Sequence, residues 1–284
     1  MIPTFRRSPT IDRNEAIARL RVIQDIPTLP DCFLRIQQVL RHPDSDSADL
    51  ADVIRTDQAT SAMVLKQANS PAFSGGTRTI ASIQEAVTRL GMNEVAEIAM
   101  IISLVQGFPL PATAGKVRRF WTHAFLVGSI AEEIGRRIPE GERLDRQQLF
   151  TAGLLHDIGR AVLGLRIDPD YFNRPTGVLD DDEKTLELEL ANYGIDHAEA
   201  GAILMELWGF PQILIDIVLH YHRPYGECHL LPAAIIHLAN DIARTEGRRI
   251  ATIEDAAVAL REGRLYRDLD ERIAEMLQRL GEGD

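Results

Sequence analysis

The sequence predicts an all-α protein built from two helical subdomains. Apolar residues recur at intervals of three and four through most of the 284 residues, which is the period of helices with one buried face. Alternating strand-like runs joined by Asn-Gly or Asp-Gly turns are absent from the sequence. Proline and glycine clusters divide the periodic segments into helices of ordinary length. The second subdomain is expected to be a helical bundle.

Capping residues and prolines mark the first elements. The prolines of residues 26–30 indicate a loop, and the apolar stripe over residues 32–40 predicts a short helix that stops before Pro43. Residues 46–47 are candidate caps for the next helix, and residues 57–60 offer Asp or Thr to open the one after it.

The rest of the first subdomain follows from turn chemistry. Residues 69–76 are expected to form a loop, and Ser82 with Glu85 resembles a capping box that opens a helix ending at Gly91. The apolar run of residues 95–105 is far short of the roughly 20 residues that a membrane span requires, so it predicts a buried core helix.

Two prolines and several small residues at 109–115 interrupt the helical period, which places a boundary near residue 112. We therefore expect an N-terminal extension at 1–24, a helical subdomain at 25–112, a second one at 113–245 and a C-terminal helical tail at 246–284. The tail keeps an apolar stripe, so it either packs back on the body or binds a partner. In the second subdomain, helices are expected through Trp121 and His123 to Ile134, around His156 and Asp157, and over 180–192, 198–207, 211–221 and 232–244.

Composition excludes several classes of function. The 31 basic and 42 acidic side chains give a formal charge of −11, which argues against binding nucleic acid or an anionic membrane by bulk attraction. Cys32 and Cys228 have no CxxC spacing, and the amino terminus has no apolar stretch behind its arginines. A cytoplasmic protein with reduced thiols is the expectation.

The adjacent His156 and Asp157 are the most informative pair, because imidazole and carboxylate together suit zinc, iron or manganese. Helices of a bundle can each point one or two ligands at a common centre, and a metal-bound water there could attack a phosphate ester. The candidate ligands are His123, His156, Asp157, His197, His220, His222 and Asp241.

Each candidate also has a reading without a metal. His123 could be an ordinary half-buried histidine, and His197 could be a first-turn residue behind an Asp196 cap. Histidines at 220 and 222 are favoured by the helix dipole at the end of their helix. His237 and Asp241 are four residues apart, as in a carboxylate that orients a histidine.

Short motifs in both halves point to a known family. They comprise residues 26–30, 57–60, 68–73, 82–87 and 90–91, and then 120–123, 153–159, 197–201, 208–211 and 237–239. With these motifs, the run from about Asp25 to Arg244 resembles the HDOD domain, an offshoot of the HD metal-dependent phosphohydrolase superfamily.

The resemblance implies an all-helical fold of two subdomains, the second an HD-superfamily-like bundle, and a role in bacterial signal transduction as a regulatory or output module. It leaves open whether a divalent metal (iron, manganese or zinc) is bound or absent. The ligand positions that it implies as retained are His123, His156, Asp157 and His197.

The chain departs from the catalytic relatives in four respects. Their His-His pair falls on Tyr221 and His222, and their final aspartate falls on Asn240, with Asp241 displaced by one residue. One residue of shift turns a helical side chain by about 100°, away from a metal held by the other helices. Arg160 replaces a lysine that follows the motif in many catalytic relatives, and the Gly-Tyr-Pro signature is absent.

Two hypotheses follow. The first is a cytoplasmic, non-catalytic regulatory module that binds a protein partner and keeps a degenerate metal pocket (His123, His156, Asp157, His197, His222, Asn240, Asp241). The loop 69–73 is its contact candidate, unless Phe73 anchors that loop to its own core. The second is a mononuclear metal-dependent phosphohydrolase acting on a nucleotide or cyclic dinucleotide through His123, His156, Asp157 and Asp241. Its catalytic residues would be His156, Asp157 and Arg160. The oligomeric state stays open.

Overall fold

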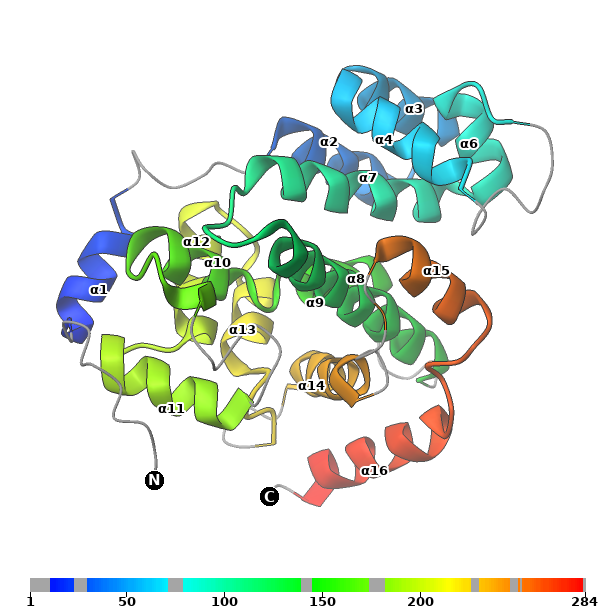
Figure 1. The fold of residues 1–284 in the computed structure, drawn as a ribbon. Coiled ribbons are helices and arrows are strands. Elements are labelled where there is room, and N and C mark those ends of the chain that lie inside the picture. Colours follow the sequence, from blue (N-terminus) through cyan, green and yellow to red (C-terminus); the bar gives the residue numbers. More distant parts are fainter. Residues whose placement is uncertain are drawn as a thin grey trace. The chain divides into compact units, whose positions relative to one another are not determined.

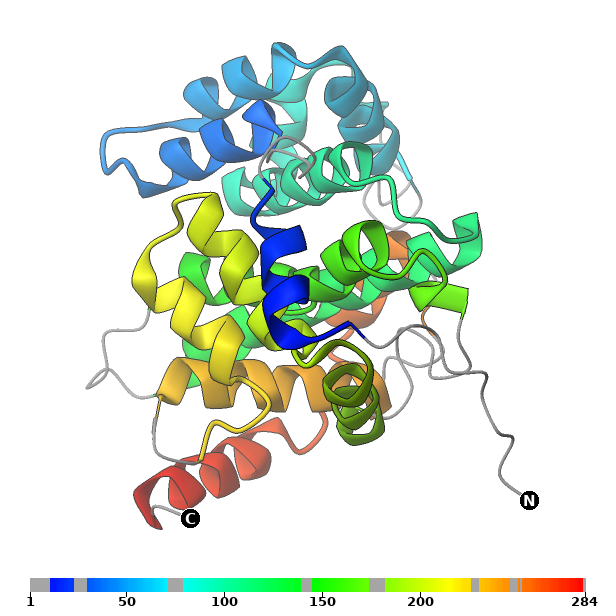
Figure 2. The ribbon, with the colours of Figure 1, turned by 90° about the vertical axis from the view of Figure 1, so that its left-hand side faces the viewer.

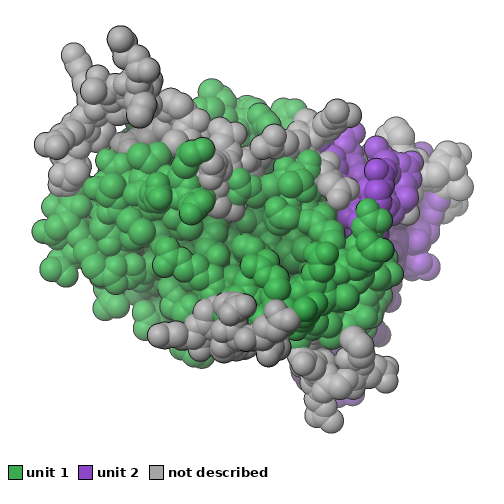
Figure 3. Space-filling view, turned by 90° about the horizontal axis from the view of Figure 1, so that it is seen from below, with its two compact units in different colours: residues 1–26, 110–248, 268–284 green, residues 27–109, 249–267 purple. Residues whose placement is uncertain are grey.

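The structure is a computed structural model, and it describes residues 11–22, 30–70, 79–138, 145–173, 182–225, 230–245, 250 and 252–282. Every regular element in these residues is a helix, as the sequence predicts (Figure 1 and Figure 2). The chain divides into two compact units, which Figure 3 colours separately. Unit 1 comprises residues 1–26, 110–248 and 268–284, and unit 2 comprises residues 27–109 and 249–267.

Unit 2 is organised around one apolar helix, α7 (Met92–Gly107), which buries almost every residue from Val95 to Leu104. This is the core helix that the apolar run predicts. None of the described helices has the length and apolar composition that a membrane-crossing segment needs. Around α7 pack α2 (Asp31–Arg41), α3 (Ser47–Arg55), α4 (Gln58–Ala68) and α6 (Ile83–Leu90), and α15 (Ile253–Arg261) also belongs to this unit.

Side-chain caps set the helix starts in unit 2. Asp46 and Asp49 form a reciprocal capping box at α3, and the Asp57 carboxylate accepts from the Thr60 amide at α4. At α6 the expected box is only half formed. The Ser82 hydroxyl accepts from the Glu85 amide, whereas the Glu85 carboxylate accepts from the amide of Ala81, one residue before the cap.

The loop predicted at 69–76 lies mostly outside the described residues, and so does its candidate contact residue Phe73. The described part shows how Asn69 holds the ends of this segment. Its side-chain amide donates to the carbonyls of Leu65 and Ile80, and its carbonyl oxygen accepts from the Ile80 amide at 2.7 Å. The Asn69 side chain therefore replaces backbone pairing at this point.

The thiol of Cys32 is buried in α2, and burial, followed by the nearby Asp57 carboxylate, raises its pKa to about 11. Because the thiolate is the reactive form, the native thiol should react about a hundredfold more slowly at pH 8 than an unperturbed cysteine. We expect this in a Cys228→Ser background, measured as iodoacetamide alkylation of native and urea-unfolded protein. Equal rates in the two states would contradict the buried placement of Cys32.

Unit 1 is a helical bundle whose longest member is α8 (Ala114–Arg137). A close contact joins α8 to α9 (Arg146–Leu155), because a Cβ on Gly153 would lie 2.6 Å from the Cα of Gly128. The unit also contains α10 (Ile158–Arg166), a 3-10 turn η2 (Tyr171–Asn173), α11 (Asp182–Tyr193), α12 (His197–Leu207), α13 (Gln212–His220) and α14 (Leu231–Thr245).

The two ends of the chain add one helix each to unit 1. α1 (Arg13–Leu20) packs on α12 and α10, where the Arg13 guanidinium pairs with both carboxylate oxygens of Glu199. α16 (Leu269–Glu282) packs on α14 and α8, and it buries Ile273 and Met276. Within the predicted tail, residues 249–267 belong to unit 2 and α16 belongs to unit 1.

Candidate functional site

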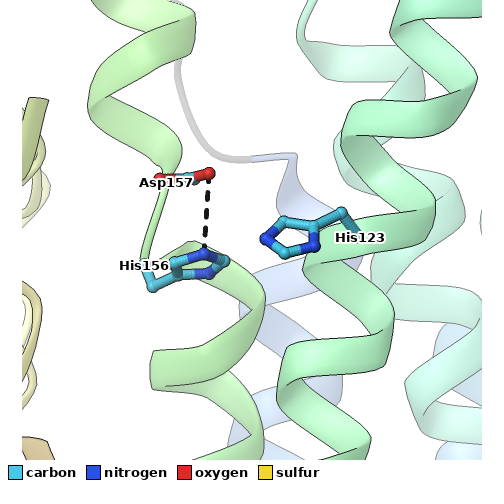
Figure 4. A group of neighbouring side chains, drawn as sticks. All are labelled: His123, His156 and Asp157. Atoms are coloured by element: carbon cyan, nitrogen blue, oxygen red, sulfur yellow. Dashed lines mark ion pairs between the residues drawn. The ribbon is translucent and has the colours of Figure 1, made fainter. Parts of the chain in front are cut away.

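His156 and Asp157 lie at a break between two helices. α9 ends at Leu155, His156 is its C-cap, and Asp157 is the N-cap of α10, so the pair does not lie within one helix. The break is tight, since the Arg160 amide donates to the Asp157 carbonyl at 2.9 Å. The His156 and Asp157 side chains project from the break between the two helices and face His123 on α8 (Figure 4).

His123, His156 and Asp157 form a buried group of possible metal ligands. One ligand atom from each lies within 4.8 Å of the other two. The Nδ1 atom of His156 lies 2.7 Å from the Gly153 carbonyl, which can only accept, so Nδ1 carries the proton. The Nε2 atom of His156 then presents a lone pair, 3.5 Å from Asp157 Oδ2. A histidine oriented by a carbonyl in this way is the usual arrangement of a metal ligand.

The other carboxylate oxygen of Asp157 faces protein groups. Oδ1 accepts from Arg160 Nε at 2.9 Å and from the Tyr221 hydroxyl at 3.0 Å, and His197 Nε2 is 3.3 Å away. Burial opposes ionisation of Asp157. However, Arg160 and the histidines around it outweigh burial and hold the pKa of this carboxyl well below its usual range.

His197 is held at both ring nitrogens. Glu189 on α11 accepts from the His197 amide at 2.8 Å, and the same oxygen lies 2.6 Å from Nδ1. The Nε2 atom lies 2.9 Å from the Tyr221 hydroxyl. Burial lowers the pKa of His197, but the adjacent Glu189 carboxylate more than offsets burial and raises the pKa above its ordinary value.

Tyr171 completes a continuous set of contacts. Its hydroxyl donates to the second oxygen of Glu189, and burial, followed by that carboxylate, raises the pKa of Tyr171 well above its usual range. Tyr171 therefore stays a hydroxyl donor at neutral pH. We call this set the buried polar network; its members are Arg160, Asp157, Tyr221, His197, Glu189 and Tyr171.

The end of α13 carries two candidate histidines, His220 and His222, on either side of Tyr221. His222 is half-buried, and its Nε2 atom lies 2.7 Å from His197 Nε2. His220 is half-buried at the last position of α13. Tyr221 between them is fully buried and carries the hydroxyl that bridges Asp157 and His197. At the position of the missing histidine, the chain thus places a hydrogen-bonding hydroxyl.

The two candidate ligands on α14, Asn240 and Asp241, face different surroundings. Asn240 is buried, whereas the Asp241 side chain is 56% exposed and accepts from Arg272 on α16 at 2.7 Å. The structure therefore does not bring Asp241 to the group, because one step along the helix turns it outward. His237, the possible partner of Asp241, has its Nδ1 atom 3.0 Å from the Tyr221 carbonyl.

Sequence reasoning missed Glu189 and Tyr171. α11 buries Glu189 with Thr185, one turn earlier, while Leu188 and Leu190 are exposed. The available signal was the alternation of leucine and glutamate over 186–190, because one helix face cannot bury every second residue. At least one of these leucines had to face outward.

The donor set fits one ion and not two. Two imidazoles and a carboxylate suit zinc, iron or manganese, and such an ion would supply a water of lowered pKa. A second ion beside Asp157 would need the Oδ1 atom, which Arg160 and Tyr221 already contact. The chemistry open to this group is that of a single ion with three protein ligands.

Proteins similar to this chain support the fold. An uncharacterised protein of Treponema pallidum (strain Nichols) is 28% identical over 204 residues, which is 71% of this chain but only 38% of the relative's length. A structure from Marinobacter aquaeolei VT8, provisionally named a signal transduction protein, is 26% identical with a TM-score of 0.69 and covers 95% of this chain and 63% of its own. One from Shewanella amazonensis SB2B, provisionally named a phosphohydrolase, is 24% identical with a TM-score of 0.63 and covers 94% and 97%.

The profile of the HDOD domain matches residues 26–224, which contain every residue of the group His123, His156 and Asp157 and of the buried polar network. The match includes most of unit 2 and, in unit 1, residues 110–224, from α8 to just beyond the end of α13. Because this match spans more than half of the chain, the chain belongs to the HDOD domain family.

Proposed function

We propose that this chain is a cytoplasmic regulatory module of bacterial signal transduction that binds a protein partner and does not hydrolyse phosphoesters. The observation that carries the proposal is the engagement of Asp157 Oδ1 by Arg160 and Tyr221. An oxygen held by a guanidinium and a hydroxyl is a poor bridge between two metal ions. In this proposal the pocket acts as a structural centre of unit 1.

Two further features support a structural role. The buried polar network joins α10, α11, α12 and α13 through groups that are almost completely buried, and such networks specify how helices pack. The exposed position of Asp241 removes one anionic ligand, which lowers the affinity for a divalent ion. The name given to the Marinobacter aquaeolei protein agrees with a signalling role.

The alternative is a mononuclear phosphohydrolase, acting on a nucleotide or cyclic dinucleotide. One observation favours it: His123, His156 and Asp157 still place three ligand atoms within 4.8 Å in a buried site. In that function the three residues would hold the ion, and Arg160 would stay bound to Asp157 rather than to a phosphate.

Metal analysis and a hydrolysis screen distinguish the two functions. We expect purified protein to show no turnover of bis-p-nitrophenyl phosphate or cyclic dinucleotides above the level of an Asp157→Ala variant, with Mn²⁺, Fe²⁺ or Zn²⁺ present. Metal content is measured by plasma mass spectrometry. The proposal fails if the protein turns over a phosphoester and Asp157→Ala abolishes that turnover while Asp241→Ala leaves it intact.

A further inference from the structure

Arg160 is a buried cation at the centre of the site. Its side chain is 2% exposed, and its Nε atom donates to Asp157 Oδ1 at 2.9 Å. A guanidinium keeps its charge in a protein interior, so it must be matched there by an anion. The positive charge of Arg160 also opposes protonation of His197 and favours ionisation of Tyr171. Its charge therefore reaches most of the buried polar network.

The two oxygens of Asp157 have different surroundings. Oδ2 faces His156 Nε2 at 3.5 Å, on the side of the group His123, His156 and Asp157. Oδ1 faces Arg160, Tyr221 and His197 Nε2, at 2.9, 3.0 and 3.3 Å. His222 lies next to His197, with 2.7 Å between the two Nε2 atoms. The Oδ1 side thus gathers imidazole nitrogens of His197 and His222 around a carboxylate oxygen, and these are atoms that commonly bind metal ions. The positive charge among them is that of Arg160.

We propose that Arg160 is a built-in cation that stands at Asp157 Oδ1 in place of a metal ion and keeps divalent ions away from the Asp157, His197 and His222 side of the site. A divalent ion there would have to displace the guanidinium from Oδ1 and would also be repelled by its charge. The inference rests on the proposed function, since a module that does not hydrolyse phosphoesters needs a stable charge at Asp157 and not an exchangeable ion.

The test is replacement of Arg160 by neutral and charged residues in the full-length chain. Arg160→Gln removes the charge, and Arg160→Lys keeps it. We expect Arg160→Gln to bind Mn²⁺ at least about tenfold more tightly than the unmodified chain, because a neighbouring positive charge has been removed. Arg160→Lys should stay within about threefold of the unmodified chain. Binding is measured by isothermal titration and by the spin-resonance signal of free Mn²⁺.

Two further variants assign the new binding. Adding Asp157→Asn or His222→Ala to Arg160→Gln should abolish the gain, since each removes a ligand from the side that Arg160 guards. Equal Mn²⁺ affinity of Arg160→Gln and the unmodified chain would overturn the inference. A gain that survives both added substitutions would overturn it too.

Arg160→Gln could also fail to fold, because it leaves Asp157 buried without its cation. In that case circular dichroism is followed while Mn²⁺ is added. Refolding by Mn²⁺ supports the inference, because the ion then replaces the lost charge, and a chain that stays unfolded at saturating Mn²⁺ overturns it. Hydrolysis of a phosphoester by the unmodified chain would contradict the proposed function. The inference on Arg160 would still be decided by the Mn²⁺ affinities of the variants.

Discussion

Replacing Gly159 by alanine is expected to destabilise unit 1 by at least about 3 kcal/mol, the upper range for overpacking a rigid core. α10 and α12 come so close at this point that a Cβ on Gly159 would lie 1.8 Å from the His197 carbonyl oxygen and 2.6 Å from the Gly201 amide nitrogen. Both obstacles are backbone atoms, so the helices must move apart. That movement would also pull His197 away from Glu189.

The matched control is Gly115→Ala on α8, where an added Cβ meets nothing within 4 Å. Alanine is the better helix former, so this variant should be as stable as the unmodified chain or more stable by up to about 1 kcal/mol. Stability is measured by urea unfolding followed by tryptophan fluorescence, because Trp121 and Trp208 both belong to unit 1. Equal stability of the two alanine variants would contradict the close approach of α10 and α12.

Replacing Asp157 by alanine is expected to cost about 3 to 5 kcal/mol of unfolding free energy, the usual loss when one partner of a buried ion pair is removed. Asp157 is 3% exposed, and its removal leaves the guanidinium of Arg160 buried without its carboxylate. Tyr221 loses its acceptor at the same time. The measurement is urea unfolding in the presence of a chelator, so that no bound metal contributes.

Asp241→Ala is the control for this prediction. Asp241 forms an ion pair with Arg272, but its side chain is 56% exposed, and exposed pairs contribute less than about 1 kcal/mol. A loss of similar size in Asp157→Ala and Asp241→Ala would mean that burial does not distinguish these two carboxylates. Adding Arg160→Met to Asp157→Ala should restore part of the lost stability, because it removes the stranded charge.

Most of the fold could be predicted from local sequence. The helices over 32–40 and 95–105 and the caps at Asp46 and Asp57 depend on residues close together in the chain. The break between α9 and α10 could not be predicted in this way. The periodicity of the apolar residues continues through His156 and Asp157. The close contacts on either side of the break, of Gly153 with α8 and of Gly159 with α12, exist only in the packed chain.

The candidate site divides in the same manner. The sequence motifs pointed to His123, His156 and Asp157 as ligands, and the fold brings these three side chains together. The motifs did not reveal Glu189 or Tyr171, because these residues lie on segments with no motif. They reach the site only when α11 and η2 pack against the other helices. The motifs also could not say whether Arg160 faces a substrate or Asp157.

The sequence by itself determined the helical class, most helix boundaries and the residue types available for a metal site, because periodicity and capping act over a few residues. Only the tertiary structure decided which charges face each other. Asp157 is the N-cap of α10, Tyr221 is the C-cap of α13 and Glu189 lies on α11, and the packing of these helices sets their distances. Arg160 is only three residues from Asp157, but Tyr221 is 64 residues away and reaches the same carboxylate oxygen only in the packed chain. The surroundings of the buried Asp157 charge are therefore set in large part by the tertiary structure.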